Sequence, residues 1–197
     1  MAWAKNGTPN TLSGTSDTIT ISDLTSTKFN QLISHQLASG NISADYRLGN
    51  GSIDSGSNYS SRVSDDGGTD GTATSDNRMR VHPNGAGADI FNTGYIVNIA
   101  TEEKLAMSFS IDNSGTGAGN APSRREGVSK WVNTSNQFDQ AQVYNSQTGN
   151  YTVDSNLSAL TGDETETVTL QDGTIFEETD TNKAYIWSSS SETWTQL

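Results

Sequence analysis

Short runs of alternating apolar and polar residues, separated by clusters of Gly, Asn, Asp and Ser, recur along the whole chain. Thr18–Ile21 alternates in this way, and so do Ala44–Leu48 and Tyr59–Val63. A two-residue period places successive side chains on opposite faces of a strand, as in half-buried antiparallel strands. The clusters, such as Gly49–Gly51 and Asp65–Gly71, favour tight turns. About ten short strands with regular turns predict an all-β protein, an antiparallel β-sandwich of jelly-roll type.

The most apolar part of the chain is a predicted hairpin in its middle. Ile90–Ile99 is expected to form one strand, with a bulge at Gly94. A polar turn follows at Thr101–Lys104, and Leu105–Ile111 then alternates Leu, Met, Phe and Ile with Ala and Ser. We expect this hairpin to form the core of the sandwich.

Other segments give weaker signals. Ser26–Leu37 could start as a capped helix, but its β-branched and Phe content favours a strand. Trp131 is expected in the core, with Val128 and Val132 as its apolar neighbours. The later strands are expected at Lys130–Val132, Phe138–Val143 and Leu157–Leu160.

The chain divides into three predicted parts. Residues 1–24 form an N-terminal arm and first strand, residues 25–163 the sandwich, and residues 164–197 a small β-meander. The boundary falls in the polar, acidic run 160–166. A three-stranded meander is too small to bury four large aromatic side chains by itself. We expect these side chains to dock on a neighbouring copy or another protein: Phe176, Tyr185, Trp187 and Trp194.

The composition of the chain excludes some classes of binding partner. The 197 residues carry a net charge of −12, which repels nucleic acid and anionic membrane surfaces. There is no cysteine, so disulfides and thiolate metal sites are excluded. The N-terminus has no apolar stretch of signal-peptide length, and no segment reaches the length of a membrane span. We therefore expect a protein made in the cytoplasm and not inserted into a membrane.

Two loops are candidate binding sites. Clustered carboxylates in a Gly-rich turn suit Ca²⁺, and the alternative is a solvated turn between strands. Tyr144 and Tyr151 could stack on a sugar ring, although Asn, Asp and Tyr are common throughout this chain. No cofactor other than this possible Ca²⁺ is expected. The predicted calcium ligands are Asp65, Asp66, Asp70 and Asp76.

A third candidate is a basic cluster in an otherwise acidic chain. Arg124, Arg125 and Lys130 lie within seven residues, after a Gly-rich loop that contains Pro122. They could bind carboxylates across a subunit interface, or they could balance local acids such as Glu126.

Enzymatic activity is not expected. The two histidines, His35 and His82, lie far apart, and neither a nucleophile elbow nor a phosphate loop occurs. A glycosidase-type carboxylate pair assembled from distant loops stays open as an alternative.

The chain also resembles a known kind of module. The segments Gly115–Gln137, Gly56–Ser75 and Glu102–Leu105 are similar to a structural module of marine tailed-phage virion proteins. The run from Asp172 to Trp194 looks like a short β unit found near the ends of such proteins.

The resemblance covers roughly residues 25–165 and 170–197. It implies a virion location, binding to other virion proteins and symmetric oligomers, which we expect to be trimers. The expected role is capsid decoration, head fibre or tail component. The alternative is a carbohydrate-binding module of a tail fibre that recognises a host surface glycan.

Overall fold

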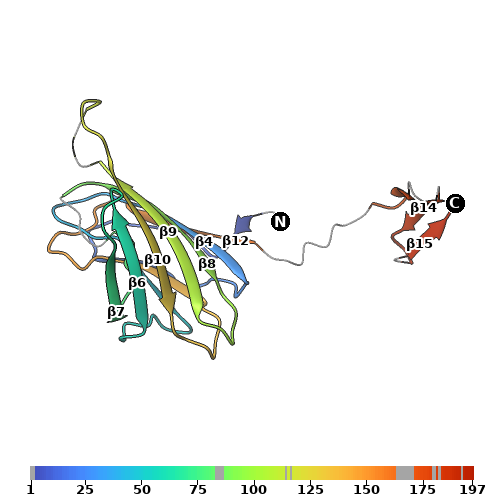
Figure 1. Cartoon of the computed structure of the whole chain (residues 1–197), viewed down its shortest axis with the longest axis horizontal. Helices are drawn as coiled ribbons and strands as arrows, with labels where there is room; N and C mark the ends of the chain where they lie inside the picture. The colour runs from blue at the N-terminus through green and yellow to red at the C-terminus, as the bar shows by residue number, and fades with distance from the viewer. Residues whose placement is uncertain are drawn as a thin grey trace. The chain divides into compact units, whose positions relative to one another are not determined.

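The computed structural model describes residues 3–82, 87–113, 115, 117–162, 171–178, 181, 183–191 and 193–197. Every regular element in these ranges is a β-strand, so the predicted all-β class is confirmed (Figure 1). Contacts divide the chain into two units, Met1–Glu164 and Thr165–Leu197. The boundary predicted from the sequence, between residues 163 and 164, lies one residue earlier.

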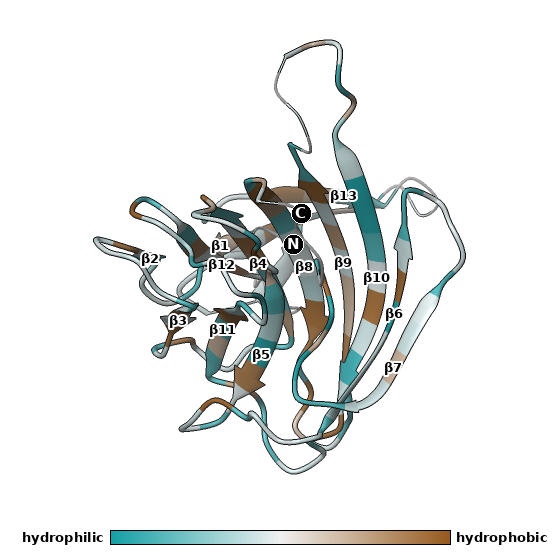
Figure 2. Ribbon diagram, turned by 90° about the vertical axis from the view of Figure 1, so that its left-hand side faces the viewer, coloured by the Kyte–Doolittle hydropathy of each residue, from teal (hydrophilic) through white to brown (hydrophobic). Residues whose placement is uncertain are grey.

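The first unit is a sandwich of a large antiparallel sheet and a small one, with apolar residues of both sheets in one core (Figure 2). Across the large sheet the strands are β1 (Ala4–Lys5), β12 (Asn156–Gly162), β4 (Phe29–Gln36), β8 (Ile90–Val97), β9 (Lys104–Asp112), β10 (Ser123–Trp131), β6 (Tyr59–Asp65) and β7 (Gly71–Asp76), and β2 (Asn10–Thr11) also pairs with β12. The small sheet runs β3 (Thr18–Ile21), β11 (Gln140–Tyr144) and β5 (Asp45–Gly49). The strand predicted within Ser26–Leu37 is confirmed as β4.

Trp131 lies in the core, as the sequence predicts. Its side chain is buried, and its ring stacks on Tyr59 with centroids 6.3 Å apart. The indole Nε1 donates a hydrogen bond to Oδ2 of Asp54 at 2.7 Å, so the polar edge of the ring is satisfied. The expected neighbours differ, because Val128 and Val132 are exposed.

The predicted bulge at Gly94 is wrong. Strand β8 keeps one continuous register with β4 and with β9 through this residue. Gly94 faces the small sheet, where a Cβ atom would lie 2.7 Å from Cε2 of Tyr46. The glycine therefore makes room for the buried tyrosine ring, and no irregularity in the strand is needed.

Replacing Gly94 by Ala should lower the free energy of unfolding by about 1–3 kcal/mol, because the added methyl group overpacks the core against Tyr46. Denaturant unfolding followed by circular dichroism measures this loss. Gly14→Ala is the matched control, since a Cβ there meets nothing within 4 Å. Equal effects at the two positions would contradict the packing explanation.

The predicted central hairpin forms, but the expectation that its apolar residues build the core is wrong for β9. Leu105, Met107 and Phe109 point to solvent, while Ala106 and Ser110 point inward. Ser110 packs against the loop that contains Val81: its Oγ donates a hydrogen bond to the Val81 carbonyl oxygen at 3.3 Å. The remaining buried positions of β9 hold the polar Lys104 and Asp112, so the large apolar side chains of this strand lie on the opposite face.

The second unit is an antiparallel meander of β13 (Ile175–Glu178), β14 (Lys183–Ser188) and β15 (Thr193–Gln196). Its aromatic rings cluster: Phe176 lies 6.3 Å from Tyr185 and 6.1 Å from Trp194, measured between ring centroids. Phe176 and Trp194 stay exposed within this unit.

Candidate functional site

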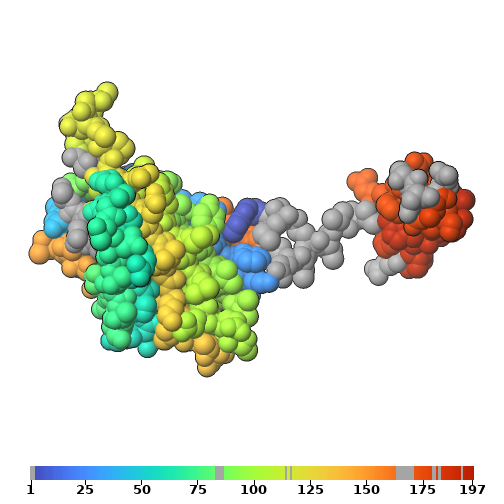
Figure 3. All heavy atoms as spheres, in the orientation of Figure 1, coloured from blue at the N-terminus to red at the C-terminus, as the bar shows by residue number. Residues whose placement is uncertain are grey.

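Six large apolar side chains on three neighbouring strands face away from the small sheet. Each is between 44% and 64% exposed. We call this surface the outer apolar face, and its members are Phe91, Tyr95, Leu105, Met107, Phe109 and Val128. Figure 3 shows β6, β10 and the β8–β9 hairpin side by side on one side of the unit.

The strand register makes this face continuous. Tyr95 of β8 lies opposite Met107 of β9, and Met107 lies opposite Val128 of β10. Directly opposed residues in antiparallel strands have Cβ atoms about 4.5–5.5 Å apart, so their side chains touch. Phe109 lies two residues beyond Met107 on the same side of β9. The apolar side chains therefore form one patch and are not scattered singly.

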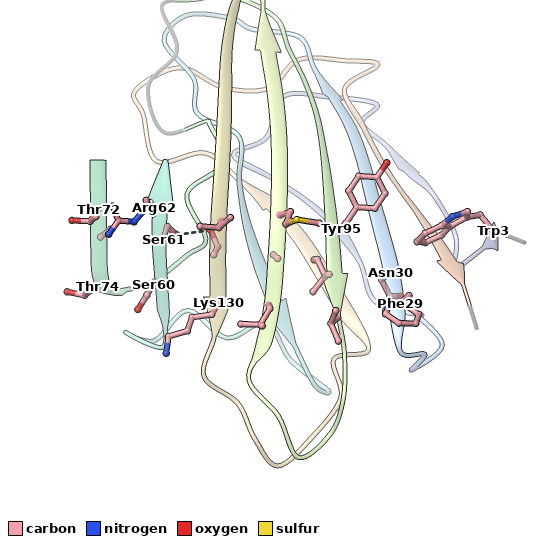
Figure 4. A pocket seen from close by; sticks show the side chains of 18 residues that line it. Trp3, Phe29, Asn30, Ser60, Ser61, Arg62, Thr72, Thr74, Tyr95 and Lys130 are labelled. Atoms are coloured by element: carbon pink, nitrogen blue, oxygen red, sulfur yellow. Dashed lines mark hydrogen bonds between the residues drawn. The ribbon is translucent and has the colours of Figure 1, made fainter. Parts of the chain in front are cut away.

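An open hollow of about 860 Å³ lies over the patch. Figure 4 shows Trp3 and Phe29 at one end of the hollow and Thr72 and Thr74 at the other. The ring of Trp3 meets that of Tyr95 edge to face, with centroids 6.2 Å apart. The site is thus broad and shallow, aromatic at the β4 side and polar at the β7 side.

Ion pairs lie around this face. Each joins a cation of β6 or β10 to a carboxylate of the same chain, so local charges balance in a chain whose net charge is −12. Such exposed pairs contribute only about 0–1 kcal/mol each to stability. Their main effect here is that they neutralise the charge beside the face. The pairs are Arg62–Asp70 at 3.2 Å, Lys130–Glu103 at 2.8 Å and Arg124–Glu126 at 3.5 Å.

The three basic residues predicted for an interface separate into two kinds. Arg124 and Lys130 keep exposed side chains beside the outer apolar face. Arg125 alternates with them and points inward, where its guanidinium lies 3.1 Å from Asp65 and 3.8 Å from Asp112. Arg125 therefore has a role within the fold, and an interface role for Arg124 and Lys130 stays a prediction.

The four predicted calcium ligands all contact other protein groups. Asp65 pairs with Arg125, Asp70 with Arg62, and Asp76 with Arg78 and Arg80, while Asp66 accepts a hydrogen bond from the Arg124 amide at 2.8 Å. Over the ranges that the structure describes, no three His, Cys, Asp or Glu side chains are grouped to hold a metal ion. Calcium binding stays a prediction.

The predicted sugar platform at Tyr144 and Tyr151 is wrong for Tyr151. Its ring is buried in the core, and its hydroxyl donates a hydrogen bond to the Ser43 carbonyl at 2.6 Å. Tyr144 has the guanidinium of Arg47 stacked 3.5 Å from its ring centroid. A sugar would need an exposed aromatic face, which a core tyrosine does not offer.

A buried polar cluster was missed by sequence reasoning. Nδ1 of His82 lies 3.0 Å from Oγ of Ser110, and Nε2 lies 3.0 Å from Oδ2 of Asp112. Burial, and next the positive charge of Arg125, lower the pKa of His82, so the ring is neutral at pH 7. A histidine placed between a serine and an aspartate is also the arrangement of a nucleophilic triad. All three side chains are buried, however, and the cluster ties β9 to the loop before β8.

Neither a protein-family profile, nor a curated protein, nor a solved structure matches this chain. Among the residues that the structure covers, no helix has the length and apolar character to cross a membrane.

Proposed function

We propose that this chain is a viral structural protein that forms oligomers at the surface of a phage-like virion. The observation that carries the proposal is the outer apolar face. Monomeric soluble proteins seldom leave large contiguous apolar patches uncovered, and such patches mark surfaces that bind a partner. A protein whose main surface feature is an exposed apolar patch functions by binding other protein chains.

The virion location comes from the resemblance of residues 25–165 and 170–197 to modules of marine tailed phages. Capsid decoration, head fibre and tail component are the roles that fit this class, with synthesis in the host cytoplasm and other virion proteins as partners. The exposed Phe176 and Trp194 of the second unit support a further contact with a neighbouring protein.

Quantitative mass spectrometry of purified particles tests this function. We expect the chain in many copies per particle, at a constant ratio to the major capsid protein. Its absence from particles, in a culture whose cell lysate contains it, would contradict the proposal.

A second candidate function is carbohydrate binding, favoured by the edge-to-face pair of Trp3 and Tyr95 at one end of the hollow. Both rings are partly exposed, and aromatic faces are suitable platforms for sugars. A glycan array that shows binding by the wild-type chain and none by Tyr95→Ala would support this function. No glycan signal with the wild-type chain would exclude it for the glycans tested.

A further inference from the structure

Among the described residues, the two sheets of the first unit end in four edges, and the chain covers three of them. The edge of a sheet carries a row of unpaired backbone N–H and C=O groups with which another chain can pair. Proteins therefore usually shorten or cover their edges. On one side of the large sheet, β12 is covered by β1 and β2, which have only two residues each. The other side of the large sheet ends at β7.

The edges of the small sheet, β3 and β5, are hydrogen-bonded by other parts of the chain. On β5 the Tyr46 amide donates to the Met79 carbonyl at 3.0 Å, and the Met79 amide donates to the Tyr46 carbonyl at 2.8 Å. On β3 the Asn10 side chain donates to the Thr20 carbonyl at 2.9 Å. These contacts occupy backbone groups along both edges of the small sheet.

Strand β7 is the exception. Its six residues lie at the end of the large sheet (Figure 4). Over the ranges that the structure describes, the backbone of residues 72–75 has no hydrogen-bond partner beyond those of the β6–β7 pairing. Residues 72–75 are Thr, Ala, Thr and Ser, so the Lys, Pro and inward-pointing charges that often protect an edge do not occur there. The edge of β7 is thus left open.

The outer apolar face leads to this open edge. One row of directly opposed residues crosses the sheet from β8 to β7, in the order Tyr95, Met107, Val128, Arg62 and Thr72. The hollow over the face also ends at β7. A strand added beside β7 would place every second side chain in line with this row, because side chains alternate between the two faces of a sheet. Apolar or β-branched side chains suit those positions, since they pair well across strands.

We infer that the open edge of β7 binds an extended segment of another protein, which adds one strand to the large sheet. An extended backbone matches the row of N–H and C=O groups along a strand edge, whereas a sugar ring or an acyl chain does not. In this mode of recognition, main-chain hydrogen bonds give affinity and alternate side chains give specificity. The partner segment therefore contains no proline in its paired stretch and has apolar or β-branched residues at every second position. The inference goes beyond the proposed function, because it does not depend on a virion location.

A peptide that copies residues 58–66, which contain β6, is the probe. Strand β7 already pairs antiparallel with this sequence on its inner side. Fluorescence anisotropy of the labelled peptide, titrated with the full chain, should show a dissociation constant of about 1 mM or tighter. Hydrogen exchange at the amides of residues 71–75 should slow at least about tenfold with saturating peptide. A scrambled peptide of the same composition should do neither.

Two variants of the edge sharpen the test. Thr74→Pro removes a backbone N–H within the register shift of the β6–β7 pairing, and edge strands and bulges tolerate proline. It should weaken peptide binding at least about tenfold. Ala73→Lys serves if the proline variant fails to fold, because an added strand would cover a charge at this half-buried position. Val153→Lys is the matched control, since Val153 is exposed and lies outside β7, and it should bind the peptide like the wild type.

Three results would overturn the inference. The first is no binding of the peptide at about 1 mM, and the second is equal affinity of wild type and the folded edge variants. The third is a wild-type chain that dimerises without peptide and becomes monomeric in Thr74→Pro, because a second copy would then occupy the edge. Sedimentation equilibrium of the wild type and of Thr74→Pro distinguishes this last case. The copy number in particles is measured separately, so the inference and the proposed function can fail independently.

Discussion

Replacing Trp131 by Ala is expected to lower the free energy of unfolding of the first unit by about 3–5 kcal/mol. The indole is 2% exposed, stacks on Tyr59, and donates a hydrogen bond to Asp54. Truncation leaves a cavity where the ring stood, removes apolar contact with Tyr59, and takes a donor from the Asp54 carboxylate. Urea unfolding followed by far-ultraviolet circular dichroism measures the change.

Val128→Ala is the control for this experiment, because Val128 lies on the same strand, β10, but faces outward. In dilute protein it should change the free energy of unfolding by no more than about 0.5 kcal/mol. A loss at Trp131 below about 1 kcal/mol, or similar losses at the two positions, would contradict the assigned faces of β10.

Replacing Asp45 by Ala is expected to cost about 3–5 kcal/mol, the range for breaking a buried ion pair. Asp45 is fully buried on β5, and its Oδ2 accepts a hydrogen bond from Nε of Arg78 at 2.8 Å. Its Oδ1 accepts another from the Val81 amide at 3.0 Å. Without the carboxylate, the Val81 amide loses its acceptor and the Arg78 guanidinium loses its shortest ion pair. The loss should fall near the lower end, because Arg78 also reaches Asp76 at 3.4 Å.

Asp45→Asn separates the two contributions, since its amide oxygen can still accept the Val81 hydrogen bond while the charge on Arg78 loses its partner. We expect a smaller loss than for Ala, measured by thermal unfolding at neutral pH. Identical melting temperatures for wild type and both variants would show that the pair is not buried as described.

The strands could be predicted from the sequence because their two-residue period is local. β3, β5, β6 and β9 all lie where the alternation predicts strands, and β4 lies where the β-branched and Phe content predicts one. The same period cannot say which face is inside. In β9 the alternation predicts apolar residues in the core, yet the buried positions are Lys104, Ala106, Ser110 and Asp112, and the large apolar side chains lie on the other face. β5 is buried on both faces, because Asp45 pairs with Arg78 and Arg47 stacks on the ring of Tyr144.

The polar interior could not be predicted from the sequence, because whether a polar side chain is buried depends on segments that only the fold brings together. Lys104 was expected in an exposed turn, but it is buried and its ammonium group donates to the carbonyl oxygens of Ala100, Glu102 and Asn133. His82 likewise meets Ser110 only after β9 folds over the loop. In β9 the polar and small side chains point into the core. The large apolar side chains of the strand therefore point outward and form part of the outer apolar face.

Thiol labelling of two single-cysteine variants tests the inverted orientation of β9 most directly. The chain has no cysteine of its own, and positions 106 and 107 are neighbours on opposite faces of the strand. In dilute native protein, Met107→Cys should react nearly as fast as an unfolded peptide, and Ala106→Cys should be slower by roughly a factor of 100 or more, the protection expected for a thiol that reacts only after opening. A fast Cys at 106 with a protected Cys at 107, at every protein concentration, would contradict the account.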